Sequence, residues 1–507
     1  MVSRTVASLA SAALLASCLS APASSIPSPL TQVVGPLAQS EASHAFGGAA
    51  YTLEPENLGA QCYIEEEFVV SGEANVYDWP AAGAVVRTAD APYATRVLVR
   101  RPKSQGKFSG RVVVEMLNPS NLFDLNIGWA INHAETVRSG DAWVGVTAKP
   151  VAVVTLKGFD AQRYASLSWA NPLPADDPKN CAVSGDTTKE TENGLVWDIH
   201  TQVAQWLRSG DASNPLRYGG KTTRAKRLYG WGYSQTGSFL FTYINAIQPL
   251  VIATGGKSPF DGYIVAVSSG PAQINQCAER IPAGDPRRPI RNAVTPVIHV
   301  MSQSDYLGWV PSRRGDSDAK GDQYRHYDIA GSGHATPDEL WFAARSEDIV
   351  KGGRTPPALN CDQGPRSRFP SPVPFNAIYR NLKTWVEKGI APPPSQNIEV
   401  VDGKPVLDAQ GNVKGGVRSP FLDAPTSVWN GNSTGLSFCR IAGHEIPLTP
   451  SQLAALYPSQ KAYEVAFRKS VDDLVKARFI TSEDGAALTA GNGAAPWFRM
   501  LAQRIIH

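Results

Sequence analysis

The chain has 507 residues, of which 42 % are hydrophobic and 18 % charged, and its formal net charge is +3. This supply of apolar side chains can bury a large core, at a length that is normal for an elaborated α/β protein. The basic residues are spread out, with no run longer than pairs such as Arg100-Arg101. The composition therefore argues against a nucleic-acid-binding protein.

Residues 1–23 are predicted to be a secretory signal peptide. Arg4 supplies a positive charge, residues 6–19 form a short apolar segment, and residues 21–23 (A-P-A) offer a cleavage site. A membrane helix would need ~20 apolar residues, and we expect no later segment to cross a bilayer. Residues 15–18 also fit a bacterial lipobox, so a lipid anchor at Cys18 stays open. We therefore expect a secreted or periplasmic protein.

Residues 24–54 are rich in Ser, Pro and Ala and are predicted to form an exposed linker. Residues 55–390 are expected to form the core, in which strand-like and helical segments alternate. The predicted strands are 63–70, 96–100, 111–117, 142–147, 228–233, 263–267, 297–301 and 324–329, and the predicted helices are 194–207, 340–350 and 376–388. This alternation favours the α/β class, with a mostly parallel sheet that carries helices on both faces.

Two segments of the chain are additional to the strands and helices of such a core. Residues 150–193 connect a strand to a helix over far more than the usual two to about six residues, and they carry Phe159, Tyr164, Trp169 and Pro172. This insertion is either a lid or acyl pocket at the active-site face, or a loop that packs on the sheet edge. Residues 391–507 form a C-terminal extension with a predicted helix at 453–476, which either caps a substrate cleft or packs as a structural belt.

The segment around Ser234 is the strongest indication of function. An apolar run from Leu228 leads into G-Y-S-Q-T-G at residues 232–237, and an apolar-periodic segment follows. The pattern predicts a strand, a sharp turn and a helix, with the Ser234 hydroxyl presented at the turn to a histidine and a substrate carbonyl. The usual motif is G-x-S-x-G. Thr236 departs from it, and similar residues also occur in ordinary loops.

A nucleophilic serine on such a turn needs an acid and then a histidine later in the chain. Asp305 follows the predicted strand 297–301, and His334 lies in the glycine-rich loop 330–335 after the strand 324–329. Their order and settings predict the triad Ser234, Asp305 and His334. The alternative for Asp305 is to cap a short helix, and for His334 to bond to a loop backbone.

Other acids and histidines fit these roles less well. Asp328 lies inside a predicted strand, and Asp338 follows the histidine instead of preceding it. His299 is expected to be a hydrogen-bonded core residue. His326 lies in the middle of a strand, and His133 and His200 are expected on helix faces.

The oxyanion of an acyl-transfer intermediate needs two N–H donors. The residue after the nucleophile, Gln235, should supply the first. The second is expected from the loop that follows the strand 111–117. Pro119 of that loop has no N–H, so the donor is predicted to be Asn118 or Ser120, with a plain turn as the alternative.

Five cysteines follow the predicted signal peptide: Cys62, Cys181, Cys277, Cys361 and Cys439. None of them has C-x-x-C spacing, so neither a metal site nor a redox motif is indicated. Export favours disulfides, and five cysteines allow two bridges with one left free. The spacing does not identify the pairs.

With these residues placed, the chain resembles the α/β-hydrolase-domain family of exported bacterial serine hydrolases, whose members are mostly defined by sequence. The segments that carry the resemblance are 112–119, 194–200, 232–237, 330–335, 407–420 and 448–457. They extend over nearly the whole chain after about Glu54. The resemblance implies the α/β-hydrolase fold and a serine carboxylester hydrolase activity, and it says little about the substrate.

The predicted function is hydrolysis of small or lipid-like carboxylic esters through an acyl-enzyme intermediate on Ser234, with no metal or organic cofactor required. Two alternatives stay open. The same triad could cleave amides or transfer the acyl group to an acceptor other than water, or the chain could be an exported binding protein on a hydrolase scaffold. The sequence does not indicate an oligomeric state.

Overall fold

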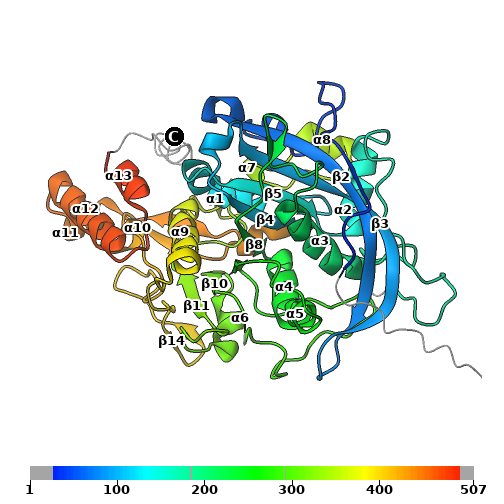
Figure 1. Ribbon diagram of the computed structural model, residues 1–507. Helices are drawn as coiled ribbons and strands as arrows, with labels where there is room; N and C mark the ends of the chain where they lie inside the picture. Colours follow the sequence, from blue (N-terminus) through cyan, green and yellow to red (C-terminus); the bar gives the residue numbers. More distant parts are fainter. Residues whose placement is uncertain (1–26, 183–184, 292, 491–507) are drawn as a thin grey trace, which may run out of the picture.

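The computed structural model describes residues 27–182, 185–291 and 293–490. The predicted signal peptide, including Cys18, lies outside the described residues. Within them, the chain is built around a nine-stranded sheet with the strand order β1-β2-β3-β5-β4-β8-β9-β10-β11 (Figure 1). Its strands are β1 (Gln32–Val34), β2 (Tyr63–Asp78), β3 (Val85–Pro102), β4 (Arg111–Leu117), β5 (Ala142–Thr147), β8 (Arg227–Tyr233), β9 (Gly262–Ala266), β10 (Val297–Ser302) and β11 (Tyr324–Ile329).

The sheet is parallel from β5 through β4, β8, β9 and β10 to β11, and antiparallel from β1 to β3 and between β3 and β5. All residues of β5, β9, β10 and β11 are buried, which parallel strands require because helices cover both of their faces. The predicted fold class is therefore confirmed.

Helices lie on both sides of the sheet (Figure 1). On one side α1 (Ile127–Arg138) packs against α9 (Pro372–Lys388), and on the other lie α3 (Val196–Arg208) and α4 (Gln235–Thr242). The remaining helices are α2 (Pro150–Phe159), α5 (Gln248–Ala253), α6 (Tyr306–Trp309), α7 (Asp338–Trp341), α8 (Ser346–Lys351), α10 (Pro420–Asp423), α11 (Pro450–Leu456), α12 (Gln460–Lys476) and α13 (Ser482–Ala490). The short strand pairs are β6 (Arg217–Tyr218) with β7 (Lys221–Thr222), β12 (Asn360–Cys361) with β13 (Gly364–Pro365), β14 (Val400–Val401) with β15 (Lys404–Pro405), and β16 (Ser427–Asn430) with β17 (His444–Pro447).

The helix that follows the turn at Ser234 runs without a break from Gln235 to Ala253, because a π-helical turn at Tyr243–Ile247 joins α4 to α5. By length and apolar composition alone this helix could cross a membrane. Its residues are mostly buried in the protein, and α4 packs against β8 and β9. Its apolar character is that of a core helix.

The N-terminal segment is not simply an exposed linker, and for residues 44–52 that prediction is wrong. β1 pairs with β2, and Phe46 is 1 % exposed. The guanidinium of the buried Arg96 on β3 donates to the Phe46 carbonyl oxygen (2.5 Å) and pairs with Glu67 (2.5 Å) and Asp124 (3.3 Å). A core arginine thus holds the segment, because its buried charge needs these acceptors.

The insertion, residues 150–193, is mainly a packing element at its start. Phe159, Tyr164 and Trp169 are buried in the main core. The Tyr164 hydroxyl donates to Glu67 on β2 (2.8 Å), and Ser168 forms a bridge with Ala94 on β3. Its end has a second role, because Thr187 and Asn193 line a cavity that is described below.

The C-terminal extension lies along the β11 edge of the sheet. Gln396 and Val417 form bridges with Tyr327 and Ile329 of β11, and α10 packs on α12 farther along the chain. A small separate apolar cluster joins Val471 and Leu474 of α12 to Val373 of α9. We find the extension to be a belt on the core over this edge.

Two disulfides join Cys181 to Cys277 and Cys361 to Cys439, and Cys62 is free and exposed. This agrees with the prediction of two bridges with one cysteine left over. The first bridge ties the insertion to the connection between β9 and β10, and the second ties the start of the β12–β13 hairpin to the extension. Such bridges persist in oxidising compartments.

Replacing Arg96 by Met should lower the free energy of unfolding by about 3–5 kcal/mol, because Glu67 and Asp124 would lose a buried counter-charge. Denaturant unfolding of the two proteins measures the change. Lys469 forms an exposed ion pair with Asp473 on α12, so Lys469→Met is a matched control with an expected loss below ~0.5 kcal/mol. Equal losses in both variants would contradict a structural role for the Arg96 cluster.

Candidate active site

Ser234 stands at a strained turn between β8 and α4. Its backbone has φ 57° and ψ −118°, a conformation that is costly for a residue with a side chain and that persists where the surroundings enforce it. The turn is tightly packed: a Cβ on Gly232 would lie 2.3 Å from the Thr236 carbonyl oxygen, and one on Gly237 would lie 2.5 Å from that of Ala266. Both positions therefore require glycine.

Thr236 explains the departure from the usual motif. Its hydroxyl accepts a hydrogen bond from the Tyr233 N–H and donates to the Tyr233 carbonyl oxygen, both at 3.1 Å. The Ser234 N–H donates to the Ala266 carbonyl oxygen on β9 (2.9 Å). The threonine side chain thus closes the turn locally, so a third glycine is not needed at this position.

The three residues predicted from the sequence lie together. His334 Nε2 is 2.8 Å from Ser234 Oγ, and His334 Nδ1 is 2.8 Å from Asp305 Oδ2. With the proton on Nδ1, the imidazole donates to the carboxylate and accepts the serine proton at Nε2. This geometry can draw a proton from a serine hydroxyl.

Asp305 stands at the N-cap position of α6, but its side chain does not cap that helix. Its carboxylate instead accepts hydrogen bonds from His334 and from the Ser302 hydroxyl. The capping alternative is therefore not what the structure shows.

The C-terminal extension holds the His334 loop in place. The carbonyl oxygen of Ile441 accepts hydrogen bonds from the N–H groups of His334 (2.8 Å) and Ala335 (3.0 Å), and the Ser304 hydroxyl accepts another from His334 N–H (3.0 Å). A Cβ on Gly333 would lie 2.3 Å from the Ala442 carbonyl oxygen. No pattern in the sequence pointed to this contact, because it joins segments more than 100 residues apart.

The electrostatics around His334 favour its charged form. Burial lowers the pKa of His334, but the charge and hydrogen bond of Asp305 and the charge of Glu339 outweigh it, so the pKa is raised above its ordinary value. Burial raises the pKa of Glu339 itself to about 7, although Arg366 and His334 oppose the shift. Glu339 was not among the predicted site residues, and its position on α7 gave no motif that could have indicated it.

The rival residues have other partners. Asp328 forms an ion pair with Arg313 (2.5 Å) and accepts from His326 Nε2 (2.7 Å). His299 is fully buried and hydrogen-bonded to the Ser268 carbonyl oxygen (2.7 Å), as expected of a core histidine. His133 and His200 lie on α1 and α3, and Asp338 is buried at the start of α7.

Two of the three predicted oxyanion donors are already engaged. The Asn118 N–H donates to the Leu125 carbonyl oxygen (2.9 Å), and the Ser120 N–H donates to Asn118 Oδ1 (2.8 Å). Neither N–H is therefore directed toward a substrate, because the loop after β4 closes on itself. The Asn118 amide also donates to the Tyr233 carbonyl oxygen (2.7 Å), so Asn118 links this loop to the nucleophile turn. Gln235 is the first residue of α4, where backbone N–H groups have no partner within the helix.

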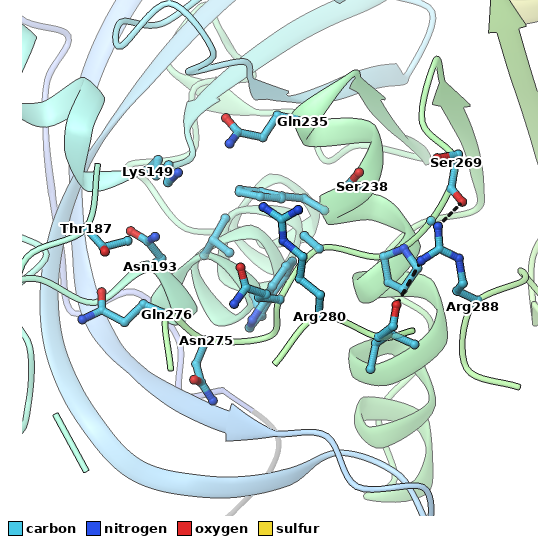
Figure 2. A pocket seen from close by; sticks show the side chains of 18 residues that line it. Lys149, Thr187, Asn193, Gln235, Ser238, Ser269, Asn275, Gln276, Arg280 and Arg288 are labelled. Carbon is cyan, nitrogen blue, oxygen red and sulfur yellow. Dashed lines mark hydrogen bonds between the residues drawn. The ribbon is translucent and has the colours of Figure 1, made fainter. Parts of the chain in front are cut away.

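A cavity of about 350 Å³ opens beside the turn (Figure 2). Gln235 and Ser238 of α4 line it, together with Lys149, Asn193 and residues that follow β9. Ser234 is not among the lining residues, and Gln235 connects the cavity to it. The site lies at the carboxyl ends of β5, β8 and β9, where open α/β sheets bind ligands. Among the described residues, no group of His, Cys, Asp and Glu is arranged to hold a metal ion.

The chain matches the model of the alpha/beta hydrolase domain family over residues 33–490. No curated protein matches it. Solved structures with some similarity include a putative dienelactone hydrolase from Klebsiella pneumoniae subsp. pneumoniae, with 12 % identity over 56 % of this chain and 95 % of that one and a TM-score of 0.27. Others are an arylesterase, with 12 % identity over 52 % and 79 % and a TM-score of 0.28, and acetyl xylan esterase 1 from Thermoanaerobacterium sp., with 10 % over 52 % and 76 % and a TM-score of 0.25. Identities this low carry no information on substrate.

Replacing Gly333 by Ala should slow the reaction of Ser234 with a fluorophosphonate about 100-fold, because the new Cβ must displace either His334 or the Ala442 backbone. The rate of labelling measures how well the serine hydroxyl is activated. Gly308 on α6 has no atom within 4 Å of the corresponding Cβ position, so Gly308→Ala is the control with an unchanged rate. A normal rate in a folded Gly333→Ala protein would show that the extension does not position His334.

Proposed function

The chain belongs to the alpha/beta hydrolase domain family, and we propose that it is a serine hydrolase that cleaves carboxylic esters. The observation that carries the proposal is the hydrogen-bonded line from Asp305 through His334 to Ser234 on a strained turn. A hydroxyl held in this way is suited to attack a carbonyl carbon.

The mechanism proceeds in two halves. His334 Nε2 takes the proton as Ser234 Oγ attacks the ester carbonyl, while Asp305 orients the imidazole and stabilises its charged form. His334 then gives the proton to the leaving alcohol, and the acyl group stays on Ser234. In the second half a water molecule loses a proton to His334 and attacks the acyl group. The bond between the acyl carbon and Ser234 Oγ then breaks, His334 returns the proton to Oγ, and the acid leaves.

The Gln235 N–H is the proposed oxyanion donor. It belongs to the first turn of α4, where unpaired N–H groups and the helix dipole favour negative charge. Loss of one such donor typically costs ~3 kcal/mol in the barrier. The close fit of Gly232, Thr236 and Gly237 around the turn supports this role, because it fixes the direction of the N–H.

Ester cleavage is favoured over the alternatives by simplicity of the chemistry. Amide cleavage and acyl transfer would use the same residues, and they remain outcomes of a substrate survey. A binding protein without turnover would have no need of a serine that is strained and paired with a histidine. We further propose that the protein is exported, since its two disulfides fit an oxidising compartment.

The purified protein should hydrolyse p-nitrophenyl esters, and Ser234→Ala should lower kcat by at least ~10⁴-fold, because the nucleophile is lost. The release of p-nitrophenol over a series of acyl chain lengths measures both the activity and the size of the acyl pocket. Ser104 is exposed and distant from the turn in sequence, so Ser104→Ala serves as the control. Activity that survives in folded Ser234→Ala would overturn the proposal, and a wild type inactive on every ester would direct the survey to amides and acyl acceptors.

The activity should fall as the pH drops through the pKa of His334, because only the neutral imidazole accepts a proton. Since that pKa is raised, the midpoint of kcat/KM should lie above the ordinary value of about 6.5. Glu339→Gln removes a negative charge that raises this pKa, so it should move the midpoint to lower pH. Glu347 on α8 is exposed, and Glu347→Gln should leave the profile unchanged. A midpoint that moves upward in Glu339→Gln would contradict this electrostatic account.

A further inference from the structure

The cavity beside Ser234 is lined mainly by three separate segments, together with Lys149 and with Val196 and Trp197 of α3. Gln235 and Ser238 come from the first turn of α4, and the stretch from Ser269 to Arg288 comes from the connection between β9 and β10. The end of the insertion supplies Thr187 and Asn193. The Cys181–Cys277 disulfide joins the last two segments directly. The shape of this cavity is therefore fixed by covalent and packing contacts that the proposed triad does not use.

The charged residues that line the cavity are all basic: Lys149, Arg280 and Arg288. Lys149 is paired with Asp186 of the insertion. Arg288 donates to the carbonyl oxygens of Ile281 (3.0 Å) and Ser269 (3.1 Å), which position it without neutralising its charge. Two of the three cations thus keep their positive charge uncompensated by a carboxylate in the described part of the chain.

Arg280 is the cation that is placed to meet a ligand. Arg280 is an exposed residue at the rim of the cavity, and no carboxylate of the described residues forms an ion pair with it. Its neighbour Glu279 is also exposed and does not line the cavity. Figure 2 shows its side chain extending across the cavity, with Lys149, Asn193 and Gln235 on one side and Ser238 on the other. A guanidinium in this position offers a carboxylate two parallel hydrogen bonds.

Two polar atoms of other residues that line this cavity lack a protein partner among the described residues. Asn193 Oδ1 and Gln235 Oε1 are buried and accept no hydrogen bond within the described chain. A buried acceptor without a donor costs about 1–3 kcal/mol. A ligand that brings hydroxyl or amide hydrogens to these oxygens would recover that cost, whereas a purely apolar acyl chain would not.

We propose that the cavity selects esters that carry a carboxylate, bound by Arg280, on a polar chain that hydrogen-bonds to Asn193 and Gln235. This inference rests on the proposed function, because it assigns the substrate class of that same site. The carboxylate is not the group that reacts. Its attraction to the uncompensated positive charge holds the ester beside Ser234, so the preference for a charged ester should be measured mainly in kcat/KM.

The test compares esters that differ only in charge. Monomethyl adipate carries the carboxylate on its acyl part, and its neutral counterpart is methyl 6-oxoheptanoate, in which a methyl ketone replaces the carboxylate and adds no N–H donor. In 6-acetoxyhexanoate the carboxylate lies on the alcohol part, and the neutral counterpart is 7-acetoxyheptan-2-one, the corresponding methyl ketone. The ratio of kcat/KM for the charged ester to that for the neutral one is measured by product release, for each pair.

In one of the two pairs, the wild type should have a kcat/KM about tenfold higher for the charged ester than for the neutral one. The pair that shows this preference tells whether the cavity binds the acyl or the alcohol part of the substrate. Arg280→Gln should abolish most of this preference, and Arg280→Lys should restore part of it because the charge returns. The preference should also shrink as the ionic strength rises. Arg468 is exposed on α12 and does not line the cavity, so Arg468→Gln is a control with the same change in net charge.

Binding to Ser234→Ala, measured by calorimetry, separates this inference from the proposed function. Ser234→Ala should bind the preferred charged ester about tenfold more tightly than its neutral counterpart, and adding Arg280→Gln should remove the difference. Cleavage of all the esters with a ratio near one would overturn the carboxylate site and leave the esterase intact. A charge preference in binding with no cleavage by the wild type would uphold the site and overturn the esterase. A preference that survives Arg280→Gln would also overturn the assignment.

Discussion

The close approach of α4 to β8 and β9 is the constraint on which the site depends. Gly232 and Gly237 leave no room for a Cβ, and the Ser234 N–H is bonded to the Ala266 carbonyl oxygen on β9. The backbone of Ser234 cannot relax from its left-handed conformation without breaking this packing. The apolar helix from Gln235 to Ala253 supplies the energy that enforces the strain, because it is mostly buried against the sheet. Ser234 is thus held rigidly by its surroundings.

His334 is held in a different way, by a part of the chain that follows the sheet in the sequence. Its loop follows β11, but the Ile441 carbonyl oxygen and the close contact of Gly333 with Ala442 fix its backbone. The Cys361–Cys439 disulfide closes the segment just before Ile441. The extension therefore acts on the proposed chemistry through the position of the imidazole, and it does so without lining the cavity beside Gln235.

The sequence predicted the residues whose role depends on local pattern. Ser234, Asp305 and His334 each follow a strand in a recognisable turn, and the structure brings them within hydrogen-bond distance. The predictions from the sequence were wrong where long-range strand pairing overrides local signals. β2 continues to Asp78 and β3 begins at Val85, so both are longer than the predicted strands 63–70 and 96–100. Their pairing includes Gly72 on β2 and Pro92 on β3, two residue types that normally indicate turns. The buried Phe46 depends on a long-range contact with Arg96. The N–H groups of Asn118 and Ser120 are instead engaged within their own loop, whose closure no motif indicated.

Reactivity and selectivity are assigned to different segments of this chain. The three hydrogen-bonded residues come from the ends of β8, β10 and β11, whereas much of the wall of the cavity comes from the insertion and from the β9–β10 connection, which carries Arg280 and Arg288. The second group is joined by its own disulfide and by Gln276, whose amide donates to the carbonyl oxygens of Cys181 (2.6 Å) and Thr188 (3.0 Å). Substitutions in that wall can alter which ligands bind while the Ser234–His334 distance is preserved. Such independence is what allows one hydrolase core to serve many substrates, since the loops vary and the strands that carry the reacting groups do not.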